Sequence, residues 1–215
     1  DNAGNNFTSF NLSSINTDAT VVDTGGLALG NVNLGTGNFT LNTTNGNLTQ
    51  TGALTSNVAD ITTGAGTATL TNAGNNFTSL DLSATNTDAS VADTGGLALG
   101  TVNLGTGNFT LDTTGGVLTQ AAGVALTSNV ADISTGAGTV NLAGTANNFT
   151  SLNLSTTDAD ASVVDTNGLA LGTVSLGTGN FTLNTNTGTV TQTGALTTNV
   201  ADITTGTGTA SDTCC

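Results

Sequence analysis

The heptad "GTGNFTL" at residues 35–41 recurs unchanged at 105–111 and again at 177–183. A second block behaves similarly: "NNFTSFNLS" at 5–13 returns as "NNFTSLDLS" at 75–83 and as "NNFTSLNLS" at 147–155. In both series the second step is slightly longer than the first. Self-similarity at a nearly constant period typically identifies repeat architectures, in which each unit packs on its neighbours. The sequence predicts one continuous domain of three units, at 1–71, 72–143 and 144–209, followed by a divergent tail at 210–215.

Two additional residues explain why the second step is longer than the first. They lie in "TQAAGVALTSNVADI" (119–133), whose counterparts read "TQTGALTSNVADI" (49–61) and "TQTGALTTNVADI" (191–203). An insertion that leaves both flanks unchanged is typical of a surface loop.

Apolar residues alternate with polar ones over short stretches, as in Val32 and Leu34 or Phe39 and Leu41. Alternation with period two indicates strands with one face inward, and Gly-Gly, Thr-Gly and Asn-Gly pairs between the stretches indicate turns. Short strands permit a sandwich, a barrel or a solenoid, but copying at a fixed period favours the solenoid. We expect an all-β, parallel β-helix of roughly 9–12 coils, each of about 17–23 residues, forming a rod roughly 45–60 Å long.

The phenylalanines are the largest side chains expected in the interior of this solenoid. They recur once in each of the two repeated blocks, at the same position in every unit. The predicted core phenylalanines are Phe7, Phe39, Phe77, Phe109, Phe149 and Phe181.

The chain contains 14 acidic residues, all of them aspartate, and no lysine, arginine or histidine. Nucleic-acid binding and docking on anionic lipid both depend on cationic side chains, so neither partner is expected. The usual general bases and nucleophile pairs cannot be assembled, and the clusters that bind zinc are absent, so we expect no enzyme activity. No apolar run reaches the roughly 18 residues of a membrane span, so membrane insertion is not expected.

Aspartates recur at equivalent places in the three units. Rows of carboxylates could bind Ca²⁺, which prefers several oxygen ligands, yet no EF-hand or GGxGxD pattern is present. We therefore expect solvated turns and no resident cofactor, and keep calcium as the alternative. The weak calcium candidates are Asp18, Asp23, Asp88, Asp93, Asp160 and Asp165.

The tripeptide "DTG" at 23–25 and 93–95 is also the catalytic tripeptide of aspartic proteases. Those enzymes need two aspartates that meet across a cleft, whereas the third copy reads "DTN" at 165–167. The sequence favours a repeated Asx-type turn at this position.

Three further features carry weaker signals. Asn-X-Ser/Thr triplets could accept glycans but arise readily in a chain of this composition. They include those that begin at Asn6, Asn38, Asn47, Asn76, Asn108, Asn148 and Asn180. Ice-binding solenoids have flat faces rich in threonine, and here Thr67 and Thr69 recur as Thr207 and Thr209. The middle unit interrupts this threonine pattern with Asn141, so the β-propensity of threonine explains it better. Cys214 and Cys215 could form an intermolecular disulfide, or could belong to a disordered end or a remnant of the expressed chain.

The run "LTQTGALTSNVADITTGAGTATLTNAGNNFTSLDLSATNTDASVADTGGLALG" (48–100) resembles the repeats of filamentous haemagglutinin-like, β-strand repeat proteins of bacterial surfaces. The resemblance extends over nearly the whole chain, three times. It implies a right-handed parallel β-helix, secreted across a bacterial outer membrane, that serves as an adhesin stalk, surface layer, fibre or sheath. It brings no catalytic residue. The closing "DTCC" departs from the repeat pattern.

The two ends of the sequence are complementary. "NAGNNFTSF" begins at residue 2 as "NAGNNFTSL" begins at 72, while the other end stops inside the unit, with Asp212 in place of Leu70 and Leu142. Natural solenoids usually cover their ends with distinct capping repeats. We expect an extracellular bacterial filament or sheath subunit that assembles head to tail with itself. The alternatives are a stalk segment of a large adhesin whose tip lies elsewhere, and an ice- or glycan-binding solenoid; the chain is either a mature product or an excerpt.

Overall fold

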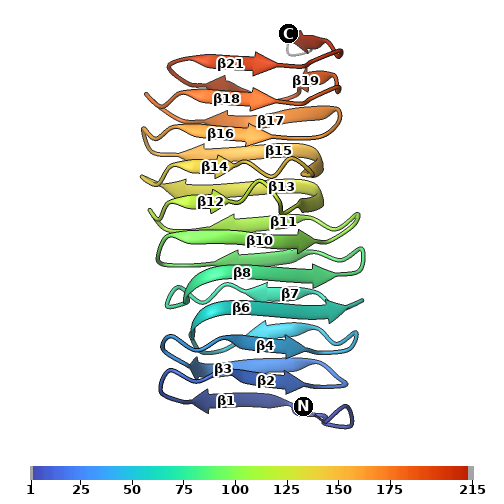
Figure 1. The fold of residues 1–215 in the computed structure, drawn as a ribbon, viewed down its shortest axis with the longest axis vertical. Coiled ribbons are helices and arrows are strands. Elements are labelled where there is room, and N and C mark those ends of the chain that lie inside the picture. Colours follow the sequence, from blue (N-terminus) through green and yellow to red (C-terminus); the bar gives the residue numbers. More distant parts are fainter. Residues whose placement is uncertain (1, 213–215) are drawn as a thin grey trace.

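The computed structural model describes residues 2–212, and every regular element within that range is a β-strand (Figure 1). The strands are β1 (Ser9–Ser13), β2 (Ala19–Val22), β3 (Leu27–Asn33), β4 (Phe39–Asn42), β5 (Leu48–Gln50), β6 (Leu54–Gly64), β7 (Ala68–Leu70), β8 (Asn76–Ala84), β9 (Ala89–Ala92), β10 (Leu97–Asn103), β11 (Phe109–Asp112), β12 (Leu118–Gln120), β13 (Leu126–Gly136), β14 (Val140–Leu142), β15 (Asn148–Thr156), β16 (Ala161–Val164), β17 (Leu169–Ser175), β18 (Phe181–Asn184), β19 (Val190–Gln192), β20 (Leu196–Thr197), β21 (Ala201–Thr204) and β22 (Ala210–Asp212).

The strands wind into a solenoid whose coils stack along one axis, with β1 and β21 near opposite ends of the rod (Figure 1). Each strand pairs in parallel with a strand of a neighbouring coil: Leu27 lies opposite Leu48, Leu48 opposite Ala68, and Ala68 opposite Ala89. The sequence distances between these partners fall within the expected coil length. The chain makes about ten turns, which confirms the predicted all-β parallel solenoid.

The interior follows from the alternation in the sequence. In β4 the side chains of Phe39 and Leu41 are buried, while Thr40 and Asn42 are only partly covered. Leucine, valine, isoleucine, alanine and phenylalanine occupy most inward positions of the other strands and form one continuous core. Each coil thus buries one face of its strands against the coils before and after it.

Large and small side chains alternate along the axis of this core. Phe109 lies between Ala89 of the preceding coil and Ala131 of the following one. The other two heptads have the same arrangement, Ala19–Phe39–Ala59 and Ala161–Phe181–Ala201. Because an interior of constant width has a fixed volume per coil, an aromatic ring is accommodated by a methyl group on either side.

The phenylalanines of the second block stack differently. Phe77 lies opposite Ser56, and Phe149 lies opposite Ser128, and both serine hydroxyls are buried without a hydrogen-bond partner. Five of the six predicted core phenylalanines are fully buried, whereas Phe7 is partly exposed. Phe7 belongs to the first described coil, which packs against one neighbouring coil instead of two.

The repeat unit does not contain a whole number of coils. Three successive pairings lead from Leu27 to Ala89, so Ala89 is the residue three coils after Leu27. The residue one repeat unit after Leu27 is instead Leu97, which lies further along the chain. Equivalent residues of successive units therefore do not stack in one column. Each copy still meets the same local neighbours, because those neighbours are set by the length of one coil.

The insertion in the second unit forms a surface loop, as predicted from its position. Residues 121–125 connect β12 to β13, and residues 121–123 are exposed. Among residues 2–212 the structure contains no helix with the length and apolarity needed to cross a membrane.

Candidate functional site

A buried asparagine and a half-buried glutamine form a polar cluster between neighbouring coils. Gln50 and Asn75 lie 25 positions apart and bond to each other in both directions: Gln50 Nε2 donates to Asn75 Oδ1, and Asn75 Nδ2 donates to Gln50 Oε1 at 3.0 Å. Asn75 also donates to the Leu70 and Ala92 carbonyls at 2.9 and 3.0 Å and accepts from the Leu54 amide at 2.9 Å. This amide pair joins three coils through one fully buried side chain.

The cluster recurs where the second and third units meet, with Gln120 and Asn147. Asn147 accepts from the Leu126 amide at 2.7 Å and donates to Gln120 Oε1 at 2.8 Å and to the Val164 carbonyl at 3.0 Å. Sequence reasoning missed these residues, although a signal was present: the chain has three glutamines, Gln50, Gln120 and Gln192, one in each unit.

The aspartates of the "DTG" and "DTN" tripeptides are buried and bound to backbone amides. Asp93 Oδ1 accepts from the Phe77 amide at 2.9 Å, and its Oδ2 accepts from Gly95, two residues on, at 2.9 Å. Asp23 accepts in the same way from Phe7 and Gly25, and Asp165 accepts from Phe149 and Asn167. The bond to the residue two positions ahead is that of an Asx turn, as predicted. The expectation that these turns are solvated is wrong, because the three carboxylates are buried among the coils.

Burial dominates the electrostatics of two of these carboxylates. Desolvation raises the pKa of Asp165 to about 6, and the backbone amides of Phe149, Asn167 and Thr166 oppose this rise only in part. Burial likewise raises the pKa of Asp93 against its bonds to Phe77, Gly95 and Thr94. No cationic side chain exists in the chain to offset the cost of holding these charges inside.

The other weak calcium candidates cap the corners of the coils. Asp88 Oδ1 accepts from the Asn108 amide of the next coil at 2.8 Å. Asp18 and Asp160 make the same 2.8 Å bond to the amides of Asn38 and Asn180. Within residues 2–212, no three acidic or other metal-binding side chains come close enough together to hold a metal ion. These aspartates thus lie at separate corners, and each accepts a hydrogen bond from a backbone amide of the next coil.

One carboxylate pair does occur on the surface. Asp60 of β6 lies directly opposite Asp81 of β8 in the parallel register. Burial, and to a lesser extent the Asp81 charge, raise the pKa of Asp60. The corresponding pair in the next unit is Asp132 and Asn153, so only one carboxylate is present there.

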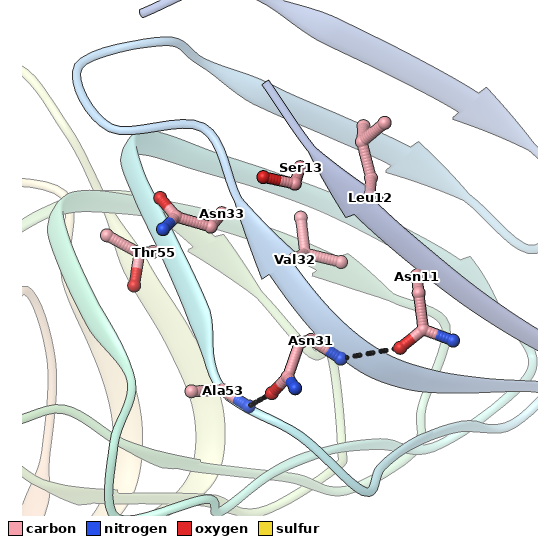
Figure 2. A pocket seen from close by; sticks show the side chains of 8 residues that line it. All are labelled: Asn11, Leu12, Ser13, Asn31, Val32, Asn33, Ala53 and Thr55. Carbon is pink, nitrogen blue, oxygen red and sulfur yellow. Dashed lines mark hydrogen bonds between the residues drawn. The ribbon is translucent and has the colours of Figure 1, made fainter. Parts of the chain in front are cut away.

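A shallow polar hollow lies beside Asp81 and beside its sequence equivalents Asn11 and Asn153. In the first unit it has a volume of about 520 Å³ and is lined by Asn11, Leu12, Ser13, Asn31, Val32, Asn33, Ala53 and Thr55. Figure 2 shows that Asn11 and Asn31 lie along its edge in successive coils. Asn11 Oδ1 accepts from the Asn31 amide at 2.9 Å, and Asn31 Oδ1 accepts from the Ala53 amide at 3.2 Å (Figure 2). The side-chain oxygens of Asn11 and Asn31 therefore accept hydrogen bonds from backbone amides of the following coil.

The remaining sequence candidates fall on strands and corners. Of the possible glycan acceptors, Asn38, Asn108 and Asn180 each accept a 3.0 Å bond from an asparagine of the next coil. Thr69 lies in a row with Ser90 and Thr110, but Asp132 continues that row. Cys214 and Cys215 lie outside the described residues.

Both ends of the coil stack present apolar side chains. At the first coil, a hollow of about 300 Å³ is lined by Phe7, Phe10, Leu12, Ala19 and Val21 together with Asn5 and Thr20. At the last coils, a smaller hollow of about 190 Å³ is lined by Leu171, Val190, Ile203 and Ala210 together with Gln192 and Ser211. Among residues 2–212, the core is therefore covered along the sides of the rod and is less covered in its first and last coils.

The arrangement of repeats agrees with a comparison against known protein families. A family model described as repeats of unknown function (DUF5649) matches residues 16–83, 86–156 and 158–211. The chain belongs to this family. The three matches agree in number and spacing with the three predicted units but begin 14 or 15 residues later in each, and each covers about three coils of the solenoid. No curated protein and no solved structure matches the chain.

Proposed function

We propose that this chain is an extracellular structural protein, a β-solenoid subunit of a bacterial surface filament, fibre or sheath that assembles end to end. The observation that carries this proposal is the distribution of open apolar surface. Partly buried members of the core occur at the first coil, as Phe7, Phe10, Leu12 and Ala19, and near the last coil, as Leu196 and Ile203. Continued stacking would cover these residues, and a longer rod would result.

The polar residues support a structural role and argue against catalysis. The buried amides and carboxylates accept or donate bonds to the backbone of neighbouring coils, as Asn75, Asn147, Asp93 and Asp165 do. Side chains that satisfy corner backbone groups are not available for proton transfer to a substrate. We therefore propose that the chain has no enzyme activity and no resident cofactor, and that its partner is another copy of itself.

The resemblance to filamentous haemagglutinin-like repeats supports the extracellular bacterial location. It supports equally the alternative of an adhesin stalk, in which further repeats of one polypeptide would cover the ends of the stack. Polar hollows that recur along the rod are the surfaces at which a glycan would bind in the third alternative.

Electron microscopy of the purified full chain tests the proposal. We expect unbranched filaments one solenoid wide, with an axial repeat of about 48 Å if ten coils stack at about 4.8 Å each. Light scattering over a concentration series should show a mass that grows without a fixed limit, because a head-to-tail interface that does not close on itself generates filaments. Single rods with the mass of one chain at every concentration would contradict the proposal.

A further inference from the structure

Comparison of equivalent residues in the three units shows what the two ends lack. Leu80 and Leu152 are fully buried, yet their equivalent in the first coil, Phe10, is only partly covered. At the other end Leu54 and Leu126 are fully buried, while their equivalent Leu196 is partly exposed. The same sequence therefore loses its cover only where the neighbouring coil is missing.

The neighbours missing at the two ends are the two halves of one kind of junction: the first coil lacks a strand of the β6 type, and the last coils lack a block of the β8 type. Inside the molecule, the block that begins at Asn76 stacks on β6, and the block that begins at Asn148 stacks on β13. Residues 5–13 of the first coil are equivalent in sequence to β8 and β15. Residues 196–204 are equivalent to the strands on which these stack, β6 and β13. The two inner junctions thus serve as two observed examples of how such blocks meet.

We infer that a second copy of this chain docks on the last coils in the register of the two inner junctions. This inference rests on the proposed function and specifies its interface. The inner junctions fix the register of this contact. In them Thr62 lies opposite Ser83, and Ser134 lies opposite Ser155. The equivalent residues place Ser13 of one copy opposite Thr204 of the other. Phe10 then covers Ala201, and Leu12 covers Ile203, as Leu80 covers Ala59 and Leu82 covers Ile61.

Charge at the junction favours the same register. The inner junction of the first two units places Asp60 opposite Asp81, two like charges on adjacent strands. The docked register instead places Asn11 opposite Asp202, as Asn153 lies opposite Asp132. A neutral amide at this position avoids the cross-strand repulsion of a carboxylate pair.

Cysteine cross-linking of the full chain tests the register directly. The background variant carries Cys214→Ser and Cys215→Ser, and Ser13→Cys with Thr204→Cys is added to it. Directly opposed residues on neighbouring strands lie about 4.8 Å apart, within the distance range that a disulfide spans. We expect mild oxidation to give a ladder of linked dimers and larger multimers that collapses on reduction.

A matched control keeps the same ends and changes only the register. The control Ser9→Cys with Thr204→Cys uses another exposed residue of β1. At the inner junctions its equivalents Ser79 and Ser151 pair with Val58 and Val130. The inferred register therefore places Ser9 opposite Val200, not opposite Thr204. Ser9 would then lie about 13 Å from the required position along the strand. We expect at least tenfold less linked multimer from this control than from the Ser13 and Thr204 pair.

The outcomes separate the inference from the proposed function. Filaments with no preferential Ser13–Thr204 link would overturn the register and leave the filament proposal in place. An absence of both filaments and cross-links would overturn both. Hydrogen exchange of the unmodified chain provides a second readout: on assembly, amide protection should rise at residues 5–13 and 196–204 and stay constant in the middle coils, and uniform protection changes would contradict the inference.

Discussion

Polar side chains inside the solenoid complete the hydrogen bonding of backbone groups that the corners would otherwise leave unpaired. Asn75 alone serves the Leu54 amide and the carbonyls of Leu70 and Ala92, besides the side chain of Gln50. Buried polar groups of this kind are tolerated only when nearly all their donors and acceptors are satisfied. A substitution at Asn75 therefore affects more than one coil.

Asn75→Ala is expected to lower the free energy of unfolding by about 2–4 kcal/mol, because several buried partners lose their bonds at once. Denaturant unfolding measures the loss, and hydrogen exchange of the Leu54 amide should accelerate. Asn76→Ala, at the exposed neighbouring position, is the matched control and should change stability by less than about 0.5 kcal/mol. Equal effects of the two substitutions would show that the amide cluster contributes nothing specific.

Asp165 makes stability depend on pH. Because the pKa of Asp165 is raised from 3.8 to about 6, the folded protein binds a proton more readily than the unfolded chain between these values. Stability from this group is fully present below pH 3.8 and is lost as the pH rises through about 6. Acidification from pH 7 to pH 4 should stabilise the fold by on the order of 3 kcal/mol through this residue.

Thermal unfolding as a function of pH, compared between the native chain and Asp165→Asn, isolates this contribution. The variant should lose the part of the pH dependence that Asp165 supplies. Asp202→Asn removes an exposed carboxylate and should retain that part of the slope. If Asp165→Asn and the native chain show parallel pH curves, the buried carboxylate is not the source.

Corners determine how closely successive coils approach, and glycine is required where backbone meets backbone. A Cβ atom at Gly116 would lie 1.7 Å from the Gly95 carbonyl oxygen of the preceding coil. At Gly123, in the inserted loop, a Cβ atom would have no heavy atom within 4 Å. The two glycines thus differ in their surroundings although both lie in turns.

Gly116→Ala should destabilise the chain by about 3 kcal/mol or more, because the clash involves backbone that cannot move without separating two coils. Gly123→Ala should be neutral or slightly stabilising, since alanine lowers the entropy of the unfolded chain. Urea midpoints of the two variants provide the comparison, and similar midpoints would contradict the proposed corner packing.

Alternation of large and small residues along the core gives a second test at the level of strands. Phe109→Ala in β11 should cost about 3–5 kcal/mol, because it leaves three small residues in one column. The double variant Phe109→Ala with Ala131→Phe moves the ring to the next coil and conserves volume, so part of the loss should be recovered. Strictly additive effects in the unfolding free energies would exclude this coupling.

The sequence predicted these elements where apolar residues alternate without interruption, as in Phe39 and Leu41. It did not predict the change of phase inside β6, where the buried positions change from Leu54 and Ser56 to Ala59 and Ile61. A buried serine and a small alanine carry no hydrophobic signal, so the pattern of burial is hidden there. For the same reason the roles of Gln50 and Asn75 could not be inferred from residue type, since both amides are usually exposed.

At the scale of the whole molecule, the uniform sign of charge opposes assembly. Each chain carries a formal charge of −14 and no cation to offset it. Repulsion between like-charged rods is screened over about 10 Å at 0.1 M salt and over about 30 Å at 0.01 M.

Raising the salt concentration from about 0.01 to 0.15 M should therefore lower the concentration at which filaments appear, by roughly tenfold or more. Light scattering at fixed pH measures this threshold, and sucrose at equal osmolarity is the control for a general solute effect. Weaker association at higher salt would contradict a contact formed by apolar coil ends.

The mismatch between the repeat period and the coil length also protects the fold against slippage. In a solenoid with identical coils, a strand displaced by one turn would meet partners as good as its own. Here a displacement of one coil would remove Phe109 from between Ala89 and Ala131. Only a displacement by an entire repeat unit restores the pairing. A chain copied three times almost verbatim thus retains a single well-defined threading.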